Sequence, residues 1–140
     1  MYGKCLCGAV TIRIAGHVPR VGACHCAMCR RWSGSAYFAF EADPAGLTVE
    51  GPVRRYRSSS FAERAFCAEC GSHLWLKDDN GPYELMPGPF DGATGFPLAS
   101  VVYDDCAPAY LPLGDAPRRR TKADYEASEA HIADTDGGPS

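Results

Sequence analysis

Cys5-Leu6-Cys7 near the start of the chain and Cys67-Ala68-Glu69-Cys70-Gly71 near its middle decide the fold. Each stretch supplies two thiols, and together they make four sulfur ligands, the number that a closed structural zinc site uses. Gly71 lets the backbone reverse after the second pair. The sequence therefore predicts one zinc that ties these distant stretches together. We call Cys5, Cys7, Cys67 and Cys70 the four-cysteine group.

A second cluster, Cys24-His25-Cys26-Ala27-Met28-Cys29, supplies three thiols. A zinc with three protein ligands keeps one position for water or substrate. His25 and Cys106 are the alternatives for a fourth ligand. His25 is disfavoured because its side chain would point away from those of Cys24 and Cys26 in extended backbone, and Cys106 fits better as a simple free thiol. We call Cys24, Cys26 and Cys29 the three-cysteine group, and predict a second zinc there.

Composition favours a single small all-β domain. The chain has 140 residues, a common size for one domain. Glycine (15) and proline (11) are abundant, which suits short strands and turns. Residues 9–14 alternate apolar and polar side chains, as a half-buried strand does. Further strands are expected at 36–42, 47–50, 53–57, 61–66, 73–77, 83–86 and 98–103.

Helix signals are few. A short helix is expected at 27–33, directly after the second cluster, and Thr121 with Asp124 resembles a capping box before residues 125–132. The last residues, 134–140, are polar and glycine-rich. We therefore expect one zinc-binding domain over 1–120, followed at 121–140 by a short helix and a flexible tail.

Charge and hydropathy exclude several classes of function. The net charge of −3 argues against a nucleic-acid-binding module, which normally carries a basic excess. No apolar run approaches the roughly 20 residues that span a membrane. The N-terminus lacks an apolar signal region, so the expected location is the cytoplasm. Thiols stay reduced there, which favours metal ligands over disulfides.

An open zinc with three sulfur ligands indicates a particular chemistry. Coordination deprotonates an incoming thiol, and the thiolate is the nucleophilic form of sulfur. The sequence thus predicts addition of a small thiol to an electrophile, or the reverse reaction.

Three motifs together resemble the glutathione-dependent formaldehyde-activating enzyme family, whose GFA domain is shared with centromere protein V. They are residues 3–10, 24–35 and 66–72, and the resemblance runs from about residue 2 to residue 113. It implies a compact all-β domain of short antiparallel strands, β-tent-like and stitched by zinc. It also implies a structural zinc at the four-cysteine group and a catalytic zinc at the three-cysteine group. The family reaction joins formaldehyde and glutathione, formally a carbon–sulfur lyase reaction in reverse.

The expected function is therefore a zinc-dependent carbon–sulfur lyase acting on a small thiol–aldehyde adduct of the glutathione–formaldehyde type. Arg30 and Arg31 follow the second cluster and are candidates for binding the carboxylates of glutathione. The alternative is a non-catalytic, zinc-stabilised protein-interaction module, in which Cys106 or His25 closes the second site. Coordination number at the three-cysteine group discriminates between the two.

Overall fold

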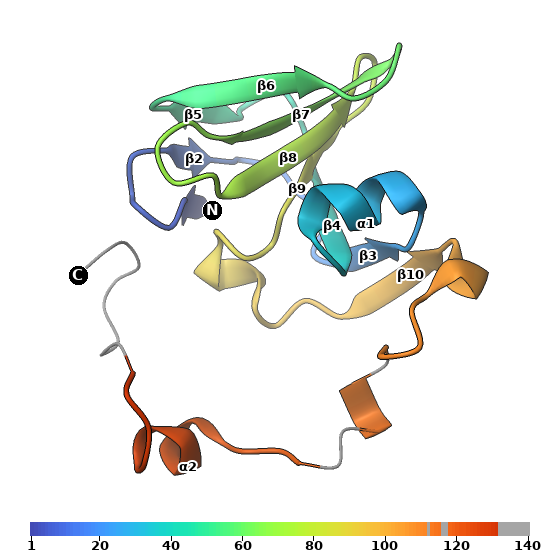
Figure 1. The fold of residues 1–140 in the computed structure, drawn as a ribbon. Helices are drawn as coiled ribbons and strands as arrows, with labels where there is room; N and C mark the ends of the chain where they lie inside the picture. The colour runs from blue at the N-terminus through green and yellow to red at the C-terminus, as the bar shows by residue number, and fades with distance from the viewer. Residues whose placement is uncertain (112, 116–117, 132–140) are drawn as a thin grey trace.

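The computed structural model describes residues 1–111, 113–115 and 118–131, and consists mainly of strands in two sheets (Figure 1). The smaller sheet has the order β1-β2-β5 and is antiparallel. Its strands are β1 (Tyr2–Lys4), β2 (Thr11–Arg13) and β5 (Thr48–Glu50). The larger sheet has the order β10-β3-β4-β9-β8-β7-β6. Its strands are β3 (Val21–Cys24), β4 (Tyr37–Ala42), β6 (Val53–Arg57), β7 (Ala62–Cys67), β8 (His73–Asp78), β9 (Tyr83–Leu85) and β10 (Leu98–Val102).

The all-β prediction is confirmed, with two differences in detail. Strands β1 and β3 were not predicted, because each is short and contains a glycine, Gly3 or Gly22. The pairing of β10 with β3 is parallel, whereas the other paired strands run antiparallel. Alternation within one strand carries no information about the direction of its partner, so this parallel pair could not be predicted.

The main core forms where the apolar faces of the two sheets meet. Val10, Ile12 and Ile14 are buried, while Arg13 between them is exposed, as the alternating pattern predicts. Phe40 packs edge-on against Phe90 with ring centroids 5.3 Å apart. Burying each such side chain stabilises the fold by about 1.5–3 kcal/mol. The same core includes Cys5 and Cys67, so the four-cysteine group lies against it.

A second, smaller core lies where helix α1 (Ala27–Ser33) packs near β4. Its buried members are Cys29, Tyr37, Ala39 and Met86, with Cys24, Cys26 and Leu76 packed against them. The helix ends at Gly34, whose φ of 88° is the left-handed conformation that glycine adopts readily. The predicted helix at 27–33 is confirmed, and it covers the three-cysteine group.

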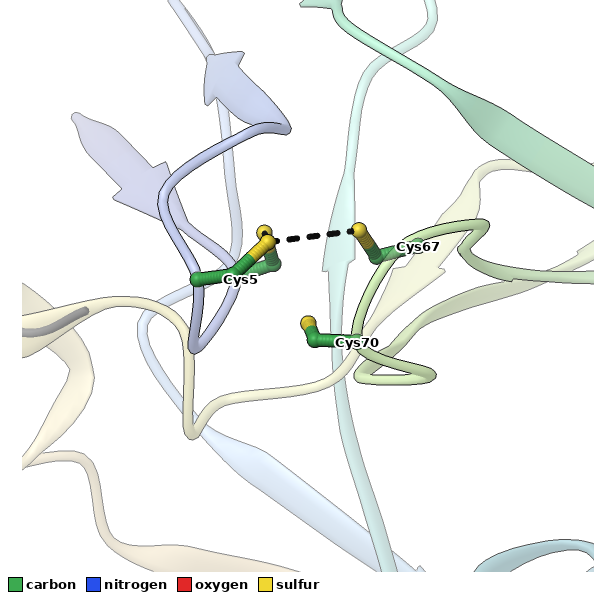
Figure 2. A group of neighbouring side chains, drawn as sticks. Cys5, Cys67 and Cys70 are labelled. Carbon is green, nitrogen blue, oxygen red and sulfur yellow. Dashed lines mark hydrogen bonds between the residues drawn. The ribbon is translucent and has the colours of Figure 1, made fainter. Parts of the chain in front are cut away.

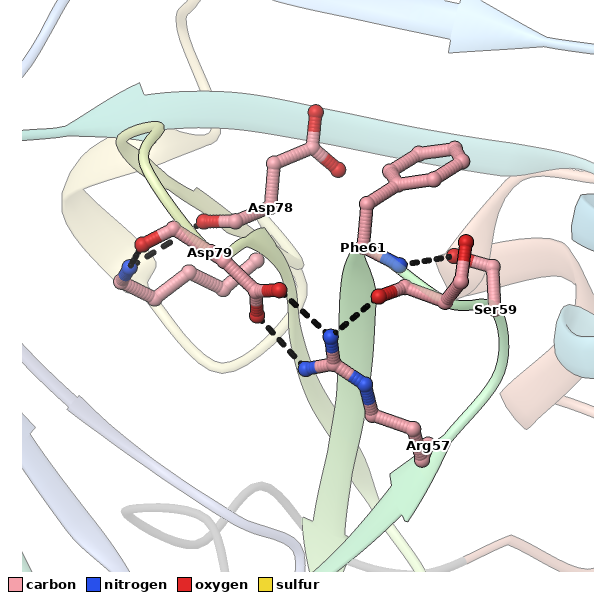
Figure 3. Close-up of polar contacts among 7 residues, drawn as sticks. Arg57, Ser59, Phe61, Asp78 and Asp79 are labelled. Atoms are coloured by element: carbon pink, nitrogen blue, oxygen red, sulfur yellow. Dashed lines mark hydrogen bonds and ion pairs between the residues drawn. The ribbon is translucent and has the colours of Figure 1, made fainter.

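The far ends of strands β6 and β8 are joined by an ion pair. The Arg57 guanidinium donates to both carboxylate oxygens of Asp79, at 2.6 and 2.5 Å, and to the carbonyl of Ser60 at 2.7 Å (Figure 3). Arg57 lies at the end of β6 and Asp79 directly follows β8, so the contact spans the intervening strand β7. It links these strands at the end of the sheet opposite Cys67, which pairs with Val53 at the other end of β6.

The C-terminal segment carries the predicted capping box. Helix α2 (Lys122–Glu126) begins after Thr121, whose hydroxyl accepts from the Asp124 amide, and the Asp124 carboxylate accepts from the Thr121 amide in return. The helix ends at Glu126, short of the expected 132, because no residue of α2 is buried against the sheets. Residues 132–140, the expected tail, lie outside the described residues, and the division into 1–120 and 121–140 stays a prediction.

Candidate metal centres

The four-cysteine group brings together the turn after β1 of the smaller sheet and the end of β7 of the larger sheet. Its four sulfur atoms lie within 4.8 Å of one another. Cys5 Sγ lies 3.6 Å from Cys7 Sγ, and Cys7 Sγ lies 3.8 Å from Cys67 Sγ; Figure 2 shows Cys5 on one side facing Cys67 and Cys70 on the other. A tetrahedron with zinc–sulfur bonds of about 2.3 Å has sulfur–sulfur edges of about 3.8 Å. The spacing of these thiols therefore fits a tetrahedral metal ion.

Tight turns shape this group. The Val10 amide donates to Cys5 Sγ at 3.2 Å, and the Gly71 amide donates to the Cys67 carbonyl at 2.9 Å. Gly71 has a φ of 78°, which a glycine adopts without strain. Burial opposes ionisation of Cys70, but hydrogen bonds from the hydroxyl and backbone of Ser72 lower the pKa of Cys70 to about 6. At least one sulfur thus favours the thiolate form that metal binding requires.

The three-cysteine group is positioned by the end of β3 and the start of α1. The sulfurs of Cys24, Cys26 and Cys29 lie within 4.8 Å of one another. Cys26 is the N-cap of α1, and its sulfur accepts from the Cys29 amide at 3.3 Å. The His25 amide donates to the Val102 carbonyl at 3.1 Å, so β10 holds the backbone between two of the thiols. The end of β3 and the start of α1 together bring the three sulfur atoms close to one another.

The three thiols have different electrostatic surroundings. Burial raises the pKa of Cys29 to about 12, against the hydrogen bond and charge of Arg64, which lower it. Burial also raises the pKa of Cys24. For Cys26 burial acts in the same direction, but hydrogen bonds from the Cys29 amide and from the neighbouring thiols outweigh it and lower the pKa. Sulfur ligands at this distance, one of them buried, suit a soft or borderline divalent ion such as zinc.

Neither candidate for a fourth ligand joins this group. Among the described residues, the clustered ligand atoms include no atom of His25 or Cys106. His25 is 8% exposed, and its Nδ1 has no hydrogen-bond partner. Cys106 is exposed and lies 3.9 Å from the Asp105 carboxylate instead. The group as described therefore offers three sulfur ligands, which fits an ion that keeps one position for another molecule.

A cleft of about 290 Å³ opens beside the three-cysteine group. Cys24 lies in its wall, together with Arg20, Tyr37, Glu84 and Val102. The Tyr37 hydroxyl donates to the Glu84 carboxylate at 3.1 Å, and burial raises the pKa of Glu84. The cleft thus combines a sulfur that could bind a metal, a cation and a carboxyl group whose pKa burial raises.

A second, wider groove of about 980 Å³ lies on the side of the four-cysteine group. Cys5 and Ser72 line it at that group, and Ser33 and Tyr37 line it towards α1. Tyr37 borders both this groove and the smaller cleft. The smaller cleft is the better candidate for substrate because a thiol of the three-cysteine group faces it.

Arg30 and Arg31, the expected carboxylate-binding residues, lie in the last turn of α1. Arg30 is half-buried, Arg31 is exposed, and neither lines the two cavities described above. Their binding role stays a prediction.

Sequence reasoning missed three residues of the site: Arg64, Tyr37 and Glu84. Arg64 in β7 is 3% exposed, and its Nη2 donates to Cys29 Sγ at 3.5 Å. A charged residue within a strand normally faces solvent, and only the position of α1 shows that this one is covered. Tyr37 and Glu84 lie in predicted strands, and nothing in the sequence shows that these strands are neighbours. Their contact could therefore not be predicted.

An all-β chain with a group of four thiols and a group of three belongs to a class of small proteins that could hold metal ions through sulfur. Residues 1–98 match the family described as glutathione-dependent formaldehyde-activating enzyme, GFA. The chain therefore belongs to the GFA family, and the resemblance predicted from its motifs is confirmed.

Two relatives agree with this assignment, and a solved structure shares the fold. A Schizosaccharomyces pombe protein named an uncharacterized lyase is 37% identical over 112 residues, which cover 77% of this chain and 82% of that protein. A Halomonas elongata protein provisionally named a glutathione-dependent formaldehyde-activating enzyme is 33% identical over 97 residues, covering 62% of each chain. The crystal structure of a Rhodobacter sphaeroides protein has the same fold, with a TM-score of 0.55 and 24% identity, over 71% of this chain and all of that one. Within the described part of the chain, every helix is too short or too polar to cross a membrane.

Proposed function

We propose that this protein is a zinc-dependent carbon–sulfur lyase that forms or cleaves the adduct of a small thiol and a small aldehyde, of the glutathione–formaldehyde type. Membership of the GFA family and the lyase name of a relative support the reaction class. The observation that carries the proposal is the three-cysteine group, whose clustered sulfurs have no fourth protein ligand among the described residues and border a cleft at Cys24.

Cys24, Cys26 and Cys29 are assigned to hold the zinc of the reaction, and the four-cysteine group to hold a structural zinc. A zinc ion held by these three sulfurs would supply a Lewis-acidic centre that favours the thiolate form of a thiol bound there. In the forward direction the thiol sulfur bonds to the aldehyde carbon, and the carbonyl electron pair moves onto oxygen. That oxygen takes up a proton, so the adduct contains all the atoms of both reactants. Cleavage reverses these steps.

The residues around the cleft supply binding and proton transfer. Arg20 lies in the cleft wall. Arg30 and Arg31 directly follow Cys29 in the sequence. Guanidinium groups suit the carboxylates of a thiol such as glutathione. Glu84 is hydrogen-bonded by Tyr37 and has a raised pKa, so its carboxyl group can hold the proton that the thiol loses and return it to the oxygen.

A reducing compartment suits this chemistry. All eight cysteines are free thiols in the structure, and both groups need thiolates rather than disulfides to bind a metal. We therefore propose that the protein works in the cytoplasm, on soluble thiol and aldehyde, without nucleic acid or membrane as a partner.

Exchange NMR tests the proposal. The zinc-loaded protein is added to ¹³C-formaldehyde and glutathione, and the rate of exchange between hydrated formaldehyde and the adduct is compared with the spontaneous rate. We expect acceleration by the parent protein and by Cys106→Ser, whose thiol is exposed and outside both groups, and none by Cys26→Ser. A spontaneous rate in the presence of the parent rejects this substrate pair.

Cobalt substitution tests the open position separately. Glutathione should change the visible absorption of cobalt at the three-cysteine group, because its sulfur becomes a fourth ligand. An unchanged spectrum at saturating thiol favours the closed interaction module instead.

A further inference from the structure

Arg64 is a buried cation that forms no ion pair with a carboxylate of the described residues. Its side chain is in β7 with 3% of the residue exposed. Arginine does not lose its proton in proteins, so the charge persists after burial. Within residues 1–111, 113–115 and 118–131, Nε and Nη1 have no hydrogen-bond partner and Nη2 donates only to Cys29 Sγ, at 3.5 Å. Removing an ion from water in this way costs several kcal/mol unless another charge compensates it.

Two nearby groups can offer negative charge to Arg64: the three-cysteine group, and Glu84, whose pKa burial raises and the charge of Arg64 lowers without a direct ion pair. In the described part of the chain, ion pairs join arginines 55, 57 and 120 to carboxylates, and none includes Arg64. The guanidinium carbon lies 5.8 Å from the ring centroid of Trp32 and 5.8 Å from that of Tyr37. Such ring faces attract a cation but do not neutralise it. The direct contact with Cys29 makes the three-cysteine group the partner of the charge.

The charges of that group complement Arg64. Three thiolates and one divalent ion leave a net charge of −1, and the guanidinium supplies +1. Hydrogen bonds from a charged donor to an anionic acceptor are stronger than neutral ones. With all three sulfurs as thiolates, the group and Arg64 are therefore neutral together when the group holds one divalent ion.

We propose that Arg64 is the counter-cation of the three-cysteine group, which neutralises the metal–thiolate assembly and orients Cys29 Sγ towards the ion. This makes Arg64 a positioning residue, acting through Cys29 rather than on the substrate. The inference rests on the proposed function only in requiring that the group binds a metal. It adds a specific consequence: the affinity of this group for metal depends on a side chain that is not a ligand.

Metal affinity tests the inference without reference to catalysis. Zinc binding by the parent, Arg64→Met, Arg64→Lys and the control Arg54→Met is measured in competition with a chromophoric chelator. Arg54 lies on the neighbouring strand β6 and is exposed. Loss of a residue that supports a metal ligand typically weakens metal binding 10–100-fold. We expect that loss in Arg64→Met for the second zinc alone, partial recovery in Arg64→Lys, and parental affinity in Arg54→Met.

Cobalt supplies a readout that a merely structural role would not move. Loss of the N–H···S contact should shift the sulfur-to-cobalt charge-transfer band of Arg64→Met to lower energy, with a partial return in Arg64→Lys. Metal-free Arg64→Met should melt no lower than the metal-free parent, since the substitution removes a buried charge that forms no ion pair in the described part of the chain. Parental zinc affinity together with an unshifted band in Arg64→Met overturns the inference, and a lower melting temperature of the metal-free variant counts against it.

A measurement on the parent protein covers the case in which the variants do not fold. In protein loaded with ¹¹³Cd, the Arg64 side-chain N–H protons should couple to the metal nucleus through the hydrogen bond to Cys29. Absence of both coupling and any shift of these protons on metal loading refutes the role of Arg64. Failure of the parent to bind a second metal refutes the proposed function as well, so the two failures are distinguishable.

Discussion

The same substitution placed in each cysteine group tests whether the groups have different roles. Cys67→Ser and Cys26→Ser each replace one thiol by a hydroxyl. Cys67 is fully buried at 0% exposure in the main core, whereas Cys26 is half-buried at the start of α1. The two sites should therefore respond very differently in stability.

The structure sets the size of each effect. Cys26 Sγ caps α1 by accepting from the Cys29 amide at 3.3 Å. Serine is among the best N-caps, so Cys26→Ser should change the free energy of unfolding by only about 0.5 kcal/mol. Cys67→Ser leaves a hydroxyl in the core, at a cost of about 1–3 kcal/mol if it lacks a partner. It also removes one of the four sulfurs proposed to hold a structural zinc, and such a zinc contributes about 10 kcal/mol or more in small zinc peptides. Since domains are stable by about 5–15 kcal/mol, losing even part of that term removes most of the stability.

Thermal unfolding of the zinc-loaded proteins, followed by circular dichroism, measures the difference. For a chain of this length 1 kcal/mol corresponds to roughly 3–5 °C. Cys26→Ser should melt within about 2–3 °C of the parent, and Cys67→Ser at least about 10 °C lower or with aggregation. The control Cys106→Ser should match the parent, because its thiol is exposed. The assignment of separate roles is falsified if Cys26→Ser lowers the melting temperature as much as Cys67→Ser does.

Three further predictions follow from the site and the core. During chelator titration the three-cysteine group should release its metal first, because it has one ligand fewer; simultaneous loss of both metals in elemental analysis contradicts this. Burial raises the pKa of Glu84 above its ordinary value of 4.5, so the folded protein binds the carboxyl proton more tightly than the unfolded chain does. The stability that this proton contributes is lost as the pH rises from 4.5 through the pKa of the folded state. Denaturant unfolding of Glu84→Gln should therefore show a smaller decline from pH 4.5 upward than the parent, and an identical decline refutes the assignment. Gly51 has a φ of 111°, and an added Cβ would collide with the carbonyl oxygen of Ala9, so Gly51→Ala should melt well below Gly8→Ala, whose φ is 78° but whose Cβ meets open space. Equal melting temperatures for this pair would show that the contact is relieved at no cost.

Much of the fold could be predicted because local patterns carry it. Alternation at residues 9–14 and aromatic density at 36–42 identified β2 and β4, and cysteine spacing alone identified both groups of thiols. These signals are local. The pleat makes side chains of a strand alternate between its two faces, and a turn that binds a metal requires its ligands at short sequence spacing.

The remainder depends on which elements meet in space. Val21–Cys24 contains mainly small residues and becomes a strand only because β4 and β10 pair with it on either side. Arg64 looks like a solvent-facing strand residue until α1 is placed over it. The Tyr37–Glu84 contact joins residues that are 47 positions apart in the chain. Such long-range contacts determine the surroundings of the three-cysteine group, and no pattern within one segment reports them.

Because β10 pairs with β3 from far along the chain, the two cysteine groups can be completed at different times during synthesis on the ribosome. All ligands of the four-cysteine group have been synthesised once Cys70 has emerged. The backbone at His25 gains its partner, the Val102 carbonyl, only after a further stretch of chain has been made. Val102 also lines the cleft beside Cys24, so that wall is the last part of the cleft to be translated. We therefore expect the nascent protein to acquire its structural zinc first, and to become competent for substrate only when β10 has docked.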